Sequence, residues 1–177
     1  MTQAETAGRN AAEAVETFTA GVGRSFMNKL EAAAQKEPGG VAAVLQEMRL
    51  GGKHADLRQE FDKRLKTDSS FASAYSGATN AVGDYGKSRL AVSDRLKAKG
   101  LSTTLADERL QSTDAALGEE ASRLPGRAQG KSVLEELAEK ASAMLQKAID
   151  KVASVFRRPD EPAAQQAARA APSMSMG

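Results

Sequence analysis

The chain has 177 residues and a formal net charge of +2, with two Tyr, five Phe and neither Cys nor Trp. The lack of Cys excludes disulfides, thiolate metal sites and cysteine nucleophiles. A sequence rich in Ala and Leu and poor in aromatic and β-branched residues favours helices over a β-sandwich. No apolar run is long enough for a membrane span, and we expect no secretory leader. The small net charge does not by itself indicate nucleic acid.

Residues 4–35 are predicted to form a helical segment, since their apolar positions recur every three or four residues. These positions are Ala11, Val15, Phe18, Val22, Phe26, Leu30 and Ala33. Gly21 and Gly23 lie within the stripe and predict a kink or break there. Pro38 ends the segment, and a short helix over residues 41–50 follows.

The next helix is marked by Leu57, Phe61 and Leu65, and Asp68 is a candidate N-cap for the one after it. That fourth segment, residues 71–99, has a heptad-like pattern with an apolar residue every seven positions. Arg89 interrupts its second apolar seam. The glycines at 77, 83 and 86 predict that the helix splits near residues 83–86, and Gly100 is placed as the residue after its C-terminus.

Two more helices are predicted. One begins near Ser102–Thr104, with Thr104 and Asp107 as an approximate capping box, and ends at Pro125. The other begins with a capping box of Ser132 and Glu135, and its apolar stripe runs to residue 155. The sequence therefore predicts an all-α protein, an antiparallel bundle of five to six helices over residues 1–158. Residues 159–177 have no periodicity and are predicted to be a disordered tail.

Several motifs suggest chemistry, but each has a simpler structural interpretation. The Gly-Lys-Ser triplets at 86–88 and 130–132 lack the earlier glycine of a phosphate-binding loop, and the second one suits a helix cap. Gly83-Asp84-Tyr85-Gly86 resembles an RNA-clamping loop, but Asp84 would repel phosphate and the sheet of such a domain is missing. His54 is the only histidine, and we expect it near a helix start. No catalytic residue, cofactor or metal ligand is predicted.

The charges are more informative. Residues 87–99 carry five cations, Lys87, Arg89, Arg95, Lys97 and Lys99, against one acid. Residues 104–120 carry five acids against one base. One interpretation is a phosphate-facing patch, and the other is an antiparallel helix pair whose opposite charges attract. A second basic cluster, Lys147, Lys151, Arg157 and Arg158, closes the last predicted helix.

The stretch RLPGRAQGKSVLEELAEKASAMLQKAIDKVASVFRRP, residues 123–159, resembles the Ala-rich helical C-terminal regions of plasmid mobilisation proteins and relaxases. The resemblance implies export through a type IV secretion channel by a C-terminal signal. The chain lacks the histidine cluster and the tyrosine-bearing motif of a relaxase nuclease. The resemblance therefore implies an accessory or delivery module.

The function predicted from sequence is a non-enzymatic helical protein-interaction module, cytoplasmic or exported through a type IV system. Its partner would be another protein or a second copy, bound through apolar helix faces. The alternative is a helical DNA- or RNA-binding protein that uses residues 87–99. Neither hypothesis requires a small-molecule substrate.

Overall fold

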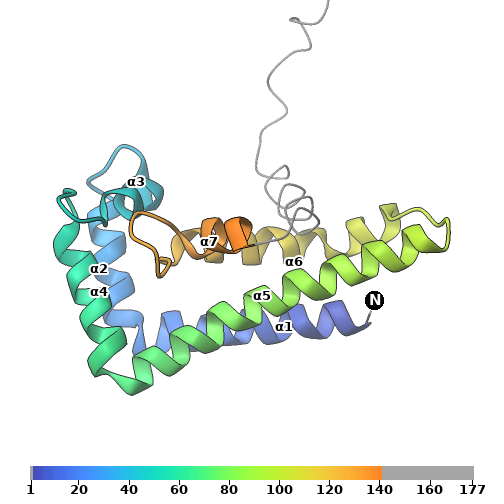
Figure 1. Ribbon diagram of the computed structural model, residues 1–177, viewed down its shortest axis with the longest axis horizontal. Helices are drawn as coiled ribbons and strands as arrows, with labels where there is room; N and C mark the ends of the chain where they lie inside the picture. The colour runs from blue at the N-terminus through green and yellow to red at the C-terminus, as the bar shows by residue number, and fades with distance from the viewer. Residues whose placement is uncertain (1, 141–177) are drawn as a thin grey trace, which may run out of the picture.

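A computed structural model describes residues 2–140, and the predicted tail and the second basic cluster lie outside them (Figure 1). The regular elements in order are α1 (Thr2–Glu16), a π-helical turn η1 (Thr17–Val22), α2 (Arg24–Ala34), α3 (Gly40–Glu47), α4 (Ala55–Thr67), α5 (Ser69–Ala98), α6 (Thr104–Arg123) and α7 (Val133–Lys140). Within this range there is no strand, only an isolated bridge between Pro125 and Ser132. The all-α prediction is confirmed.

The helices form two arms that meet at an angle (Figure 1). The long arm contains α1, α5 and α6, with α7 beside α6. The short arm contains α2 and α4, with α3 at its end. Within the long arm, α5 runs antiparallel to both α1 and α6, and the connection between α5 and α6 is a tight turn.

The change of direction between the arms begins at the predicted glycine break. Gly21 has φ −98° and ψ −120°, outside the helical region, so η1 separates α1 from α2. A Cβ on Gly23 would lie 2.6 Å from the carbonyl oxygen of Phe18, so this close turn requires glycine. The break predicted at these glycines is confirmed, and it sends α2 into the short arm.

An aromatic cluster fills the junction of the two arms, which we call the elbow. Its neighbouring ring centroids are 5.1–6.3 Å apart and most pairs meet edge to face. The members are Phe18, Phe26, Phe61, Phe71 and Tyr75. Because the rings come from η1, α2, α4 and α5, one cluster fixes the angle between the arms.

α5 is continuous from Ser69 to Ala98, so the predicted split near residues 83–86 is wrong. Each glycine costs about 1 kcal/mol relative to Ala in a helix interior. Tyr85, between Gly83 and Gly86, and Val92, after them, are both buried. The packing of these side chains outweighs the cost of the glycines in the helix. The ends are as predicted: the Asp68 side chain accepts from the Phe71 amide at 3.0 Å, and Gly100 follows the helix with φ +67°.

Side chains also bond at the N-terminal ends of α7 and α6. Ser132 Oγ accepts from the Glu135 amide at 3.2 Å, while the Glu135 carboxylate accepts from the Ser132 amide at 2.6 Å. The predicted capping box is confirmed. The box predicted at Thr104 and Asp107 is wrong: Thr103 is the N-cap and makes no side-chain bond to the helix amides, and its hydroxyl instead donates to the Asp107 carboxylate at 2.8 Å.

Candidate functional site

The end of α5, the turn that follows it and the start of α6, residues 96–105, form the tip of the long arm and expose two leucines. The amide of Leu101 donates to the carbonyl oxygen of Leu96 at 2.9 Å, and that of Gly100 to Lys97 at 2.9 Å. These bonds make a Schellman turn with a defined backbone. Leu101 is nevertheless 55% exposed and Leu105 is 79% exposed. Large apolar side chains on an ordered turn are typical of a contact surface.

Three of the predicted basic residues lie at or next to this tip. Arg95 and Lys97 are exposed in the last turn of α5 and Lys99 is its exposed C-cap, positions where cations suit the helix dipole. Lys87 is exposed about two turns before Arg95, and its ammonium pairs with Asp84 at 2.9 Å. The predicted segment therefore presents four cations on the surface, with the exposed Asp94 among them.

Arg89, the fifth predicted cation, is only 7% exposed and faces α6. Its guanidinium donates to Asp107 at 2.6 Å and to Asp114 at 3.1 Å. Burial opposes the charged form of Arg89, but the bonds to Asp107 and the charge of Asp114 outweigh it, so its pKa is raised. These pairs agree with the interpretation in which the opposite charges of the two helices attract.

The same contacts form a polar layer across the long arm, made of Tyr85, Arg89, Thr103, Asp107 and Asp114. The Tyr85 hydroxyl donates to the second oxygen of Asp114 at 2.6 Å. Burial, with the Asp114 carboxylate beside it, raises the pKa of Tyr85 and keeps the phenol protonated. Tyr85 also belongs to the main core, and a separate small apolar cluster nearer the tip is formed by Ala4, Val92, Ala106 and Leu110.

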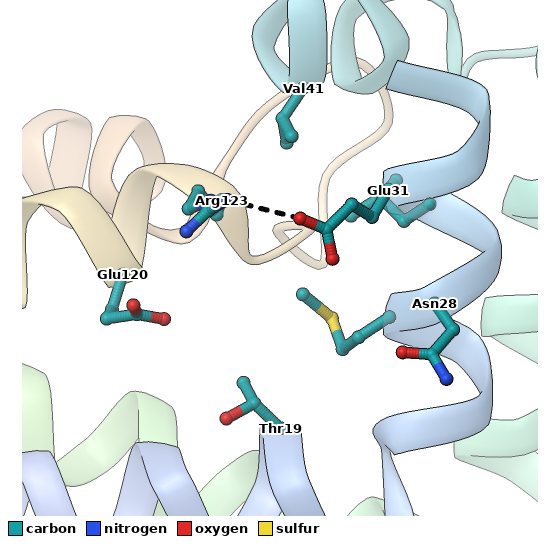
Figure 2. A pocket seen from close by; sticks show the side chains of 8 residues that line it. Thr19, Asn28, Glu31, Val41, Glu120 and Arg123 are labelled. Carbon is teal, nitrogen blue, oxygen red and sulfur yellow. Dashed lines mark ion pairs between the residues drawn. The ribbon is translucent and has the colours of Figure 1, made fainter. Parts of the chain in front are cut away.

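A hollow of about 180 Å³ lies on the inner side of the elbow (Figure 2). Met27, Leu30 and Val41 supply its apolar lining. Glu31 and Glu120 lie on its rim, and Arg123 pairs with Glu31 at 3.6 Å across it. Sequence reasoning missed this hollow because its walls come from η1, α2, α3 and α6.

His54 immediately precedes α4, as predicted, and its side chain is part-buried. Its Nε2 lies 3.1 Å from Glu37, which also pairs with Lys53. The hydrogen bonds from Lys53 and His54 hold the pKa of Glu37 below its usual value. The group connects the turn before α3 to the turn before α4, so its evident role is structural.

The second Gly-Lys-Ser triplet lies in a loop whose backbone is already used. Arg58 on α4 is buried and donates to the carbonyl oxygens of Gly126 at 2.9 Å and Ala128 at 3.2 Å. Tyr75 donates to Pro125 at 2.6 Å. A phosphate-binding loop needs free amides that converge on an anion, whereas this loop presents carbonyls to an arginine. The interpretation of Ser132 as a helix cap is confirmed.

Within residues 2–140, no group of three or more His, Cys, Asp or Glu residues could hold a metal ion. None of the helices described is long and apolar enough to cross a membrane. No protein family, curated protein or solved structure was found that matches the chain. The tip and the hollow are therefore interpreted from their own geometry.

Proposed function

We propose that this chain is a non-enzymatic helical protein-interaction module. The observation that carries the proposal is the tip, where Leu101 and Leu105 are exposed on an ordered turn beside cations. Burying a leucine contributes about 1.5–3 kcal/mol, so two adjacent leucines give a protein partner a useful anchor. The cations beside them favour a partner with acidic residues around its apolar contact.

The narrower form of the proposal is an accessory or delivery module in plasmid conjugation or type IV secretion, acting from the cytoplasm. It rests on the resemblance of residues 123–159. Leu124, Pro125, Ser132 and Val133 are buried in the fold. Residues needed for folding are poor candidates for a signal that a channel must read, so we assign the signal to the part of the chain after residue 140.

The test of the interaction is capture of binding proteins by the purified chain, followed by mass spectrometry. Leu101→Glu combined with Leu105→Glu should abolish capture of the specific partner. Leu50→Glu is the matched control, because Leu50 is 87% exposed but lies in the turn between α3 and α4. Equal capture by the wild type and the double variant would contradict the role of the tip.

The delivery role has a separate test. Deleting residues 159–177 should leave helicity by circular dichroism almost unchanged, while capture by a secretion component falls. Unchanged capture would remove residues 159–177 from the proposal and restrict the signal to residues 141–158.

Nucleic-acid binding is the second candidate, because Arg95, Lys97 and Lys99 are exposed together. It ranks lower because Arg89 is paired inside the fold and Lys87 pairs with Asp84. Three phosphate contacts would give a log–log salt slope of about −3 on duplex DNA. A gel shift at low salt that is lost when Arg95, Lys97 and Lys99 are replaced would support nucleic-acid binding. The absence of any shift would exclude it.

A further inference from the structure

The outer face of α6 has a pattern that is complementary to itself. Six residues spaced three or four apart occupy this face: Leu105, Arg109, Ser112, Ala116, Glu119 and Arg123. The first five are exposed and Arg123 is part-exposed, while Leu110, Asp114 and Leu117 on the opposite face are buried. The face therefore has Leu105 and the cation Arg109 toward its N-terminal end, and the anion Glu119 with the cation Arg123 toward its C-terminal end, beside the hollow.

When two such faces are set antiparallel, the charges of Arg109 and Glu119 complement each other between the copies. With the two-fold axis level with residue 114, Leu105 of one copy lies opposite Arg123 of the other, and Arg109 lies opposite Glu119. Ser112 and Ala116 meet at the centre, where both side chains are small and allow the helices to approach closely. A two-fold arrangement forms each of these contacts twice.

The hollow lies where Leu105 of the second copy would arrive. Glu120 and Arg123 at the end of α6 line one side of it, and Met27, Leu30 and Val41 give it an apolar lining (Figure 2). Its volume of about 180 Å³ is sufficient for a leucine side chain, since a cavity of about 150 Å³ accommodates benzene. Glu31 and Glu120 on its rim would face the cations of the arriving tip.

We propose that a second copy of this chain docks antiparallel along α6, with Leu105 of each copy seated in the elbow hollow of the other. This assignment rests on the proposed interaction function and names the partner of the tip. A single helix face with one anchor at each end is a small interface, so the dimer is weak and forms at high protein concentration.

The first test is sedimentation equilibrium of the full chain between about 10 µM and about 1 mM, a range suited to weak dimers. The wild type should approach the dimer mass at the upper end. Leu105→Ala removes the side chain that would fill the hollow of the other copy, at both ends of the interface, and should weaken dimerisation by at least about tenfold. Leu50→Ala should leave dimerisation unchanged. A wild type that stays monomeric, or a Leu105→Ala variant that dimerises normally, overturns the inference.

Charge exchange tests the register. Arg109→Glu alone and Glu119→Arg alone each place like charges opposite one another at both ends, and both should weaken the dimer. The double variant restores opposite charges and should recover dimerisation. Arg109 also pairs with Glu5, and Glu119 with Arg123, within one copy. The double variant does not restore those internal pairs. Recovery of dimerisation in the double variant therefore identifies contact between Arg109 and Glu119 of different copies, and a failure to recover overturns the register.

Cysteine crosslinking provides a second measure of the register, since the native chain has no cysteine. A mixture of Ser112→Cys and Ala116→Cys chains should form disulfide-linked dimers faster than either variant alone. Equal rates in all three samples overturn the assigned register. If the chain does not dimerise, or dimerises in another register, the capture experiment can still identify a different protein at the tip. The dimer proposal and the interaction proposal can therefore fail independently of each other.

Discussion

The elbow and the outer half of the long arm are held together in different ways. At the elbow, five aromatic rings from four elements pack at 5.1–6.3 Å. In the outer half, the apolar cluster is small and separate from the main core, and hydrogen bonds among Tyr85, Arg89 and Asp114 form a polar layer across the helices. Aromatic burial is large and tolerant of small shifts, whereas ion pairs depend on direction. We therefore expect the elbow to set global stability and the polar layer to set how the helices pair.

The largest effect should come from the elbow. Phe61 is fully buried and contacts Phe26, Phe71 and Tyr75. Phe61→Ala should lower the free energy of unfolding by about 3–5 kcal/mol, measured by urea denaturation, through lost transfer energy and a residual cavity. Leu50→Ala, at an exposed leucine, should change it by less than about 0.5 kcal/mol. A loss below about 1 kcal/mol at Phe61 would mean that the elbow does not dominate.

The polar layer should respond differently to partial and to complete removal. Asp114→Ala leaves the Tyr85 hydroxyl and one side of the buried Arg89 without a partner, and should destabilise by about 2–4 kcal/mol. Replacing the group together, with Tyr85→Phe, Arg89→Met and Asp114→Leu, should restore stability to within about 1 kcal/mol of wild type. Hydrogen exchange would locate the change in the outer half. If the triple variant is as unstable as Asp114→Ala, the polar layer contributes net stability to the fold, and its hydrogen bonds do more than compensate for the burial of its own polar groups.

This contrast also explains what the sequence could predict. The elements follow from local signals: apolar stripes, the Asp68 cap, the Ser132 box and the Gly21 break each depend on residues within one or two turns. Continuity of α5 depends on burial along other helices, so counting its glycines predicted a split that the packing prevents. The hollow is built from four elements and left no local signal.

Arg89 shows how a charge can be misread from sequence. Counting charges over residues 87–99 places it with Lys87 and Lys97, whereas its position in the apolar seam marks it as buried. Asp114 gives the matching signal, since it lies between Leu110 and Leu117 on the buried face of α6. A cation and an anion on facing apolar stripes indicate an internal pair, because a buried charge needs a partner.

Close helix contact in the outer half gives a smaller, matched test. A Cβ on Gly8 would lie 2.7 Å from Thr113 and 3.1 Å from the Tyr85 ring, which Asp114 holds in place. Gly8→Ala should therefore destabilise by about 1–2 kcal/mol despite its better helix propensity. Gly77→Ala, with no atom within 4 Å of the new Cβ, should stabilise by about 0.5–1 kcal/mol. If both changes have the same sign in thermal unfolding, α1 is not closely packed on the polar layer.

The smallest effect should come from the short arm, through Glu37. Hydrogen bonds from Lys53 and His54 lower the pKa of the folded carboxyl beneath the ordinary value of 4.5, so the unfolded chain binds this proton more readily. The stabilisation is therefore present above about pH 4.5 and is lost as the pH falls through the lowered pKa. Glu37→Gln should lower the melting temperature slightly at pH 7, and the difference from wild type should shrink toward about pH 3. Glu13→Gln, at an exposed position on α1, should show no such pH dependence. A difference that persists unchanged in acid would show that the Glu37 side chain stabilises this turn by packing and not by its charge.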